Sequence, residues 1–312
     1  MERHGALDGR GIQQIPGRLA APDPVAGQCR GFGRAAVSAP GRAVVFHPLP
    51  LLHRRDPMMA LARSVLFNIF YLGWTITMGV LFVPVLAFRA HAVRAVARFW
   101  LKGFVLGARV LLGLKLEIRG RENLPTGPAI IASKHQSAFE TFVFHQLVED
   151  PIYVLKKELV TIPFVGWYMA RSGQVSVDRK AGAGAMKAMI RDVRTALNKG
   201  GTIIIFPEGT RTLPGDCPPY QPGVAALYTQ MGVPVVPVAL NSGLFWSRNS
   251  FMKRSGTVVL EILPPIPPGL DRKVFMTQLR ERIETASAAL AGLPAPSLTL
   301  AAPADPAPSL GA

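Results

Sequence analysis

The chain has 312 residues, 49% of them hydrophobic, and a formal net charge of +16. This length allows one sizeable core together with additional segments. The two cysteines, Cys29 and Cys217, are too few for a disulfide framework and lack zinc-ligand spacing, which favours a reducing compartment.

Residues 1–57 are rich in Gly, Pro, Ala and Arg and have no persistent helical or strand period. Such a segment buries too little apolar surface to offset the entropy lost on ordering. Met58 and Met59 directly precede the most hydrophobic part of the chain. We hypothesise that the natural protein starts at one of these methionines; the alternative is a genuine disordered extension. N-terminal sequencing distinguishes the two, because a peptide from residues 10–50 contradicts the later start.

Residues 65–88 form a run of 24 residues without a charge. At ~1.5 Å per residue, a helix of this length spans the ~30 Å hydrocarbon core of a bilayer. The surrounding segment, residues 58–116, contains seven Lys or Arg residues and no acidic residue. This charge beside the most apolar stretch indicates an anionic membrane surface and not a nucleic acid. The alternative is a pair of core helices in a soluble domain.

Residues 99–116 are a second apolar segment, but they include Lys102 and Arg109. Charges at the centre of a bilayer are costly, so we interpret this segment as an amphipathic helix in the membrane interface. Arg94, Arg98 and Lys102 are expected to face anionic head groups.

Short apolar runs alternate with helical patterns after this segment. The runs predict strands at residues 116–118, 130–132, 152–155, 174–177, 202–206, 233–240 and 257–263. The helical patterns predict helices at residues 138–148, 183–198, 221–231 and 271–290. This alternation is typical of an α/β domain with a largely parallel sheet and flanking helices. Pro234 and Pro237 restrict the strand that contains them to an edge or a bulge.

The sequence thus divides into four segments. The first is a disordered or wrongly assigned extension (1–57), and the second is a pair of membrane-associated helices (58–116). The α/β domain follows (117–292), and the last segment is a disordered tail rich in Ala and Pro (293–312).

His135 closely follows the predicted strand at 130–132, and a carboxylate, Glu140, comes five residues later. In a continuous helix these two side chains would diverge by ~140°, so they meet only where His135 precedes the helix. Ser137 provides that turn, because Ser137 and Glu140 form a capping box with Ser137 as the N-cap. Glu140 is either a cap alone or also the partner of a catalytic histidine, and the two roles are compatible.

Polar residues also follow three other predicted strands. The loop Glu-Gly-Thr-Arg at 208–211, Arg179 and Lys156 each come directly after a strand or one residue later. Ligands of parallel α/β sheets bind at the carboxyl ends of strands, so we expect one crevice with a general base and a phosphate clamp. Such a crevice suits transfer to a hydroxyl group of a phosphorylated acceptor. The alternative for the loop at 208–211 is an Arg–Glu pair that only closes a surface loop. The alternative for Lys156 is a solvated side chain with no part in binding.

Four blocks occur in order along the chain: His135-x4-Glu140, Gly-Gln-Val-Ser-Val-Asp-Arg at 173–179, Phe-Pro-Glu-Gly-Thr-Arg at 206–211 and Val-Pro-Val-Val-Pro at 233–237. Their order and spacing resemble the glycerolipid acyltransferases, most closely the 1-acyl-sn-glycerol-3-phosphate acyltransferase family. The resemblance covers roughly residues 60–265. One position departs from the family pattern, because the family usually has Asp where this chain has Glu140. Glutamate keeps the charge and adds one methylene group.

The resemblance implies transfer of a fatty acyl group from an acyl thioester, acyl-carrier protein or CoA, to the sn-2 hydroxyl of lysophosphatidic acid. The product would be phosphatidic acid, an intermediate of phospholipid biosynthesis. His135 would deprotonate the hydroxyl, and Glu140 would fix the tautomer of the ring and stabilise the imidazolium. The residues implied to bind the acceptor, by neutralising its phosphate or shaping the loop around it, are Lys156, Arg179, Glu208, Gly209, Thr210 and Arg211. No metal or redox cofactor is implied.

The resemblance also implies a membrane-dipping pair of N-terminal helices that admits lipid substrates from one leaflet. Membrane lipids are therefore expected partners, and nucleic acids are not. The expected location is the cell (inner) membrane, with the catalytic domain on its cytoplasmic face.

Three alternatives stay open. A covalent acyl-enzyme would use Ser137 or Cys217, although the chain has no Gly-x-Ser-x-Gly elbow. Another acceptor, glycerol-3-phosphate or a lyso-aminolipid, would suit similar blocks. A non-catalytic membrane lipid-binding protein would use Glu140 only as a helix cap.

Overall fold

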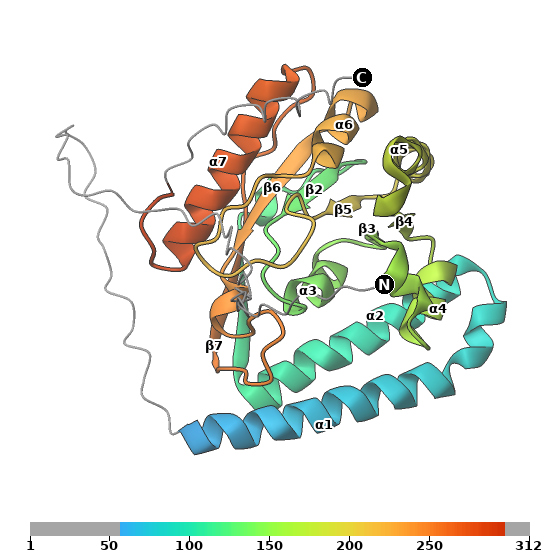
Figure 1. The fold of residues 1–312 in the computed structure, drawn as a ribbon. Helices are drawn as coiled ribbons and strands as arrows, with labels where there is room; N and C mark the ends of the chain where they lie inside the picture. Colours follow the sequence, from blue (N-terminus) through green and yellow to red (C-terminus); the bar gives the residue numbers. More distant parts are fainter. Residues whose placement is uncertain (1–56, 297–312) are drawn as a thin grey trace, which may run out of the picture.

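The computed structural model describes residues 57–296 and contains a seven-stranded mixed sheet with helices on both faces (Figure 1). The strand order is β1-β7-β6-β2-β5-β3-β4. The strands are β1 Leu114–Arg119, β2 Ile130–Ser133, β3 Ile152–Lys156, β4 Val175–Val177, β5 Ile203–Ile205, β6 Val235–Leu240 and β7 Gly256–Ile262. The α-helices are α1 Pro57–Leu81, α2 Ala90–Gly107, α3 Phe139–Leu147, α4 Val165–Arg171, α5 Gly182–Asn198, α6 Pro222–Met231 and α7 Arg272–Leu290.

The prediction of an α/β fold with a largely parallel sheet is confirmed. Strands β6, β2, β5, β3 and β4 are parallel neighbours. Strands β1 and β7 are parallel to each other, but β7 is antiparallel to β6, so these two strands run opposite to the other five. The carboxyl ends of the five parallel strands consequently lie along one edge of the sheet.

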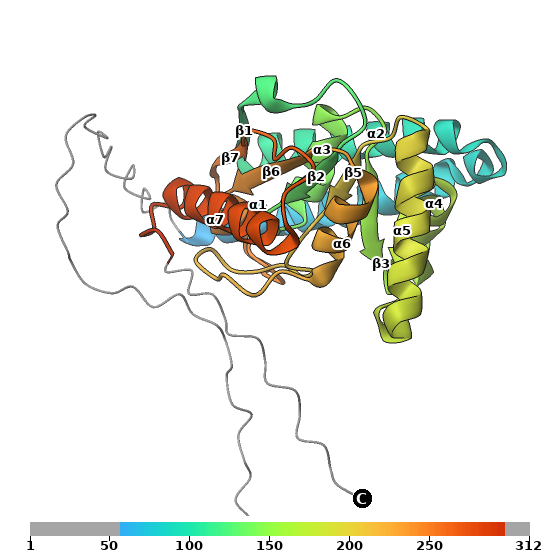
Figure 2. The same cartoon turned by 90° about the horizontal axis from the view of Figure 1, so that it is seen from above.

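The central strands are buried on both faces, which explains why they occur in the sequence as short uninterrupted apolar runs. In β2, Ile130 and Ala132 pack with residues of α5, α6 and α7, whereas Ile131 packs on the opposite face with residues of α1 and α3. This alternation follows from the two-residue period of a strand. Figure 2 shows α5, α6 and α7 together on one side of the sheet.

Strand β6 lies inside the sheet although it contains Pro237, so its prolines do not place it at an edge. The expected alternative, a bulge, is present. Leu263 N donates to Pro237 O at 2.9 Å, whereas Val235 pairs with Ile266. The segment after β7 therefore has one extra residue opposite β6, and Pro237 lies beside this irregular part of the ladder.

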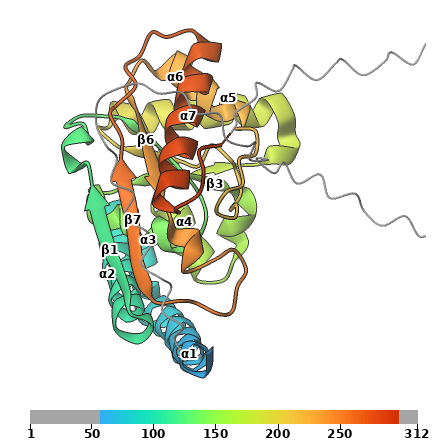
Figure 3. The same ribbon diagram turned by 90° about the vertical axis from the view of Figure 1, so that its left-hand side faces the viewer.

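Helices α1 and α2 form an antiparallel pair, and Figure 3 shows them at the end of the molecule opposite α6. Two glycines of α2 allow the close approach. A Cβ atom on Gly103 would overlap the ring of Trp74, and one on Gly107 would overlap the ring of Phe70. Small residues on α2 thus accommodate large aromatic residues on α1.

Helix α1 contacts the α/β domain near both of its ends. Ser64 Oγ accepts a hydrogen bond from Lys253 N at 2.9 Å, and Gly79 O accepts one from Tyr168 Oη at 3.4 Å. By length and composition α1 is long and apolar enough to cross a membrane. Its outward side exposes large apolar side chains: Leu61, Val65, Leu66, Ile69, Leu72, Ile76, Val80 and Leu81. An apolar face of this extent fits contact with a lipid bilayer.

The uncharged run at 65–88 is not one helix, contrary to the prediction. Helix α1 ends at Leu81, and a 3-10 helix follows at Val83–Ala87. Pro84 lies in this turn, and proline lacks the N–H group that a continuing helix would need. The proline therefore ends α1 before the uncharged run is complete.

The second predicted membrane helix, at 99–116, is wrong at both ends. Helix α2 begins nine residues earlier, and the chain enters β1 before the predicted end. Arg94 and Arg98, predicted to face head groups, instead bind within the protein, because each donates to a carboxylate oxygen of Asp150 at 2.8 Å. Lys102 is exposed. Two of the three expected head-group contacts are thus used to hold α2 to the domain.

The extension predicted at 1–57 and the tail predicted at 293–312 lie outside the described residues, apart from Pro57 and 293–296. The hypothesis that translation starts at Met58 or Met59 stays a prediction. The expected boundary between residues 116 and 117 falls within β1, so the sheet begins slightly earlier than the sequence indicated.

Candidate active site

His135 lies where the carboxyl ends of three parallel strands meet. Strand β2 ends at Ser133, and its neighbours on the two sides are β6 and β5. The His135 side chain is 16% exposed and stacks on Phe206, with the ring centroids 4.0 Å apart. The ring is therefore held in place by packing while part of it remains accessible to a substrate.

Glu140 contacts His135 from the first turn of α3, with 3.0 Å between Oε1 and Nδ1. The same oxygen accepts the backbone N–H groups of Gln136 at 2.7 Å and Ser137 at 2.6 Å, and Oε2 accepts the Ser242 hydroxyl at 2.8 Å. These backbone and hydroxyl partners are all donors, which fits an ionised carboxylate. His135 Nδ1 then carries the ring proton, and Nε2 presents the lone pair that a general base needs.

One of the two hydrogen bonds of the predicted capping box is present, the bond from Ser137 N to Glu140, and α3 begins one residue later than expected. Ala138 is the N-cap residue by position. Ser137 Oγ nevertheless accepts from Phe139 N at 3.1 Å, and Glu140 accepts from Ser137 N. Glu140 thus satisfies backbone donors at the start of the helix and contacts His135 at the same time.

Glu208 lies directly behind His135, on the segment that leaves β5. Its Oε2 accepts the His135 N–H at 2.7 Å, and its Oε1 accepts the Thr212 hydroxyl at 2.9 Å. Burial raises the pKa of the Glu208 carboxyl, while the neighbouring Lys134 ammonium and the His135 N–H oppose that effect. The side chain is fully buried. The buried Glu208 side chain is placed to orient the loop at 208–211 and not to contact a substrate directly.

Arg179 and the Glu-Gly-Thr-Arg loop are brought together, as expected from their places after parallel strands. Arg179 Nη2 donates to Gly209 O at 2.8 Å. Gly209 has a φ of 69°, and a Cβ there would lie 3.0 Å from Arg179 Nη2 and 2.9 Å from Gln221 Cγ. Glycine is therefore needed both for the left-handed backbone and for the close approach of the guanidinium group.

The other residues predicted to bind the acceptor are Thr210 and Arg211, which belong to this loop, and Lys156, which lies outside it. Arg211 and Thr210 are half-buried, and Arg211 O accepts from Arg248 Nη1 at 3.1 Å. Lys156 is exposed at the end of β3, which is separated from β2 by β5. Among the described residues, no hydrogen bond or ion pair joins Lys156 to His135 or to the loop.

The structure adds Ser242 to the predicted site. It lies just after β6, on the opposite side of β2 from Glu208, and it holds the second oxygen of Glu140. The signal was present in the sequence, because Ser242 follows a predicted strand as His135 and Arg179 do. A serine is too common after strands for its position alone to identify it.

Ser242→Ala is expected to lower the free energy of unfolding by about 1–3 kcal/mol, because a buried carboxylate oxygen loses its hydrogen bond. Urea denaturation measures this loss. Ser176→Ala, at an exposed position of β4, is the matched control and should have little effect. Equal stability of the two variants would contradict the assigned contact.

His145 is not part of the site. It lies in the last turn of α3, and its buried Nδ1 has no hydrogen-bond partner among the described residues. Burial lowers the pKa of His145 to about 4, a nearby Asp150 carboxylate opposes this, and Arg98 adds to it. The ring is therefore neutral in the folded protein near neutral pH.

The pKa of His145 predicts a loss of stability in acid. Between the usual pKa of ~6.5 and the folded value, the unfolded chain binds more protons, so stability falls as the pH drops. The difference between the unfolded and folded pKa values corresponds to about 3 kcal/mol in the free energy of unfolding. This stabilisation is fully present above pH ~6.5 and is lost by pH ~4. His145→Gln should lack this part of the pH dependence in urea denaturation at pH 7 and pH 4.5. If the wild type and His145→Gln lost the same stability between pH 7 and pH 4.5, His145 would not be a buried neutral histidine.

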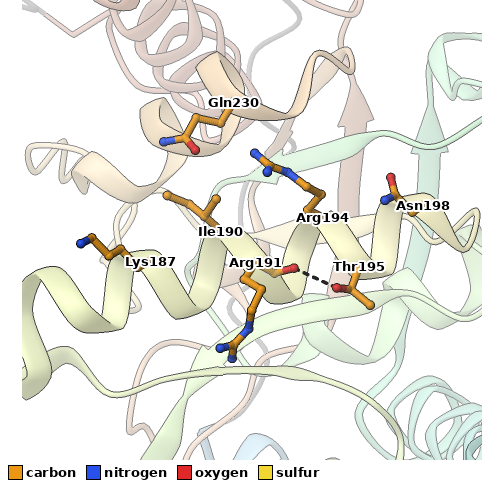
Figure 4. Close-up of a pocket in the computed structure, with 7 residues that line it drawn as sticks. All are labelled: Lys187, Ile190, Arg191, Arg194, Thr195, Asn198 and Gln230. Atoms are coloured by element: carbon orange, nitrogen blue, oxygen red, sulfur yellow. Dashed lines mark hydrogen bonds between the residues drawn. The ribbon is translucent and has the colours of Figure 1, made fainter.

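A groove of about 520 Å³ lies between α5 and α6, away from the residues that surround His135 (Figure 4). Its lining residues are Lys187, Ile190, Arg191, Arg194, Thr195, Asn198 and Gln230. These include none of the predicted site residues. Within residues 57–296, no group of three or more His, Cys, Asp or Glu side chains is arranged to hold a metal ion.

The sequence is similar to those of known acyltransferases. Residues 115–241 match the family described as Acyltransferase. The 1-acyl-sn-glycerol-3-phosphate acyltransferase of Pseudomonas aeruginosa is 35% identical over 225 residues, which cover 71% of this chain and 87% of that relative. The human 1-acyl-sn-glycerol-3-phosphate acyltransferase alpha is 29% identical over 201 residues, or 64% of this chain and 70% of that relative.

The fold is also similar to a solved structure. The crystal structure of the 1-acyl-sn-glycerophosphate (LPA) acyltransferase PlsC from Thermotoga maritima has a TM-score of 0.54 and 22% identity, covering 75% of this chain and 95% of that chain. This likeness supports the fold, while the identity and coverage of the bacterial relative support the family. The chain is therefore an acyltransferase and belongs to the 1-acyl-sn-glycerol-3-phosphate acyltransferase family.

Proposed function

We propose that this enzyme transfers a fatty acyl group from acyl-carrier protein or acyl-CoA to the sn-2 hydroxyl of 1-acyl-glycerol-3-phosphate. The product is phosphatidic acid for phospholipid biosynthesis. The observation that carries this proposal is the hydrogen-bonded pair of His135 and Glu140 beside the loop at 208–211, which contains Arg211 and binds Arg179. The names of the Pseudomonas and human relatives specify the same acceptor.

His135 is the general base of the proposed reaction. Its Nε2 takes the proton of the sn-2 hydroxyl while the hydroxyl oxygen attacks the carbonyl carbon of the thioester. The tetrahedral intermediate then expels the thiolate, which receives the proton from the imidazolium. The negative charge of Glu140 stabilises the imidazolium between these two steps, as the carboxylate does in a Ser-His-Asp triad.

The arginines are proposed to bind the acceptor phosphate. Arg179 uses one N–H group on Gly209 O and keeps further donors in its planar fork for a phosphate. Arg211 lies two residues after Gly209 on the loop at 208–211, and Thr210 lies between Gly209 and Arg211. Lys156, exposed at the end of β3, is proposed to approach the phosphate from the neighbouring strand.

The acceptor is proposed to enter from one leaflet of the inner membrane, with the catalytic domain on the cytoplasmic face. The exposed apolar side of α1 supports this position. Trp246 supports it as well, because its ring packs on Phe67 of α1 and on Phe139 of α3. The same side chain thus joins the membrane-facing helix to the helix that holds Glu140.

An acylation assay with a panel of acceptors tests this function. The purified enzyme is supplied with acyl-CoA or acyl-carrier protein, and with lysophosphatidic acid, glycerol-3-phosphate or a lyso-aminolipid. Phosphatidic acid should form from lysophosphatidic acid with at least one donor. Preferred acylation of either other acceptor would contradict the assigned substrate, and no acylation of any acceptor would favour a lipid-binding protein.

A further inference from the structure

Lys134, the residue before the proposed base, is a buried cation. Its side chain is 1% exposed, and its Nζ pairs with Glu208 Oε1 at 2.5 Å and with Glu284 Oε2 at 2.8 Å. It also donates to Asp216 O at 2.8 Å. Although burial alone disfavours a charged amine, the two carboxylates raise the pKa of Lys134 above its usual value. The ammonium group therefore keeps its charge and directs all three donors into the protein.

Glu284 brings the C-terminal helix α7 into this cluster. Its side chain is 2% exposed, and it accepts from Lys134 and, at 2.9 Å, from the Tyr220 hydroxyl. Both partners donate, as an ionised carboxylate requires. Two buried carboxylates, Glu208 and Glu284, thus share one ammonium group.

We infer that Glu284 and Lys134 are positioning residues for His135. Glu284 holds the Lys134 ammonium, and Lys134 holds one oxygen of Glu208. The other oxygen of Glu208 is thereby directed at the His135 N–H, 2.7 Å away. The chain of contacts runs from α7 to the backbone of the proposed base without a gap.

The contribution of this cluster is geometric. Buried ion pairs add little net stability compared with apolar packing of the same volume, but their hydrogen bonds define distances and directions. A catalytic group displaced by about 1 Å can lose about 100-fold in rate. A change at Glu284 is consequently transmitted to the chemical step although Glu284 does not touch the substrate.

Steady-state kinetics of Glu284→Gln tests the inference, which rests on the proposed function in taking His135 as the base. We expect kcat to fall by about tenfold or more, with the KM for lysophosphatidic acid within about twofold of the wild type. Glu281→Gln, at an exposed position three residues earlier on α7, is the matched control and should behave as wild type. Unchanged kcat in Glu284→Gln, or a rise in KM alone, would overturn the inference.

A double-mutant cycle shows whether Glu284 acts through Lys134. In the background of Lys134→Met, the further change Glu284→Gln should have little additional effect on kcat. If the two substitutions instead lowered kcat by independent factors that multiply, Glu284 would not act through Lys134. Should Glu284→Gln fail to fold, Tyr220→Phe removes one hydrogen bond from Glu284 and keeps its charge. That variant should lower kcat by a smaller factor at unchanged KM, and unchanged kcat would overturn the inference.

Hydrogen exchange provides a readout that needs no substrate. The amide of His135 should exchange faster in Glu284→Gln than in Glu281→Gln, because its acceptor Glu208 is less firmly held. Equal exchange of this amide in the two variants would overturn the inference even in an active enzyme. A wild type that fails to acylate lysophosphatidic acid would refute the proposed function and leave this measurement as a separate test of the cluster.

Discussion

His135→Ala is expected to lower kcat for acyl transfer by roughly 10²–10⁴-fold, the usual contribution of a general base. The change removes Nε2, the atom proposed to take the proton from the acceptor hydroxyl. The fold should persist, because the contacts of the His135 backbone with Glu208 and Thr212 do not involve the ring. The measurement is acylation of lysophosphatidic acid by purified variants with both donors.

His91→Ala is the matched control for this experiment. His91 is exposed on α2, so its removal should leave kcat unchanged. Thermal unfolding of both variants verifies that lost activity does not reflect lost structure. Activity of His135→Ala equal to that of His91→Ala would remove His135 as the base and would favour the acyl-enzyme or the lipid-binding alternative.

Glu140→Gln should also lower kcat by roughly 10²–10⁴-fold, by analogy with loss of the carboxylate charge in a Ser-His-Asp triad. The glutamine oxygen can still accept the backbone N–H groups of Gln136 and Ser137, so the start of α3 is maintained. The variant loses the charge that stabilises the imidazolium and holds the proton on Nδ1. Steady-state kinetics together with urea denaturation separates the catalytic effect from the capping effect.

Two further variants sharpen this result. Glu149→Gln changes a carboxylate whose side chain is 92% exposed and should leave kcat and stability unchanged. Glu140→Asp keeps the charge but shortens the side chain, so its activity should fall between those of the wild type and Glu140→Gln. Full activity of Glu140→Gln would show that Glu140 serves only as a helix cap.

The strands of the α/β domain and its helices other than α4 could be predicted from sequence because they depend on local patterns. Short apolar runs mark strands that are buried on both faces, and residues just after them reach one edge of a parallel sheet. His135, Arg179 and the loop at 208–211 all follow such strands, and the structure shows Arg179 bonded to that loop. Glu140 lies beside His135, as predicted, and accepts the Ser137 N–H at the start of α3.

The helical pair shows where local patterns are insufficient. Absence of charge predicted one membrane helix at 65–88, yet Pro84 limits α1 to Leu81. Arg94 and Arg98 appeared suited to lipid head groups, but Asp150 lies close enough to bind both. The pairing of a charged residue depends on which distant groups the fold brings near it.

By itself, the sequence determined the α/β architecture, the pairing of His135 with Glu140 and the loop that contains Arg211, because each is encoded within a few consecutive residues. Only the tertiary structure decided how this corner is supported. Ser242 reaches Glu140 across 102 positions, and Glu284 reaches Lys134 across 150 positions. Such contacts follow from the packing of strands and helices, and no local spacing in the sequence specifies them.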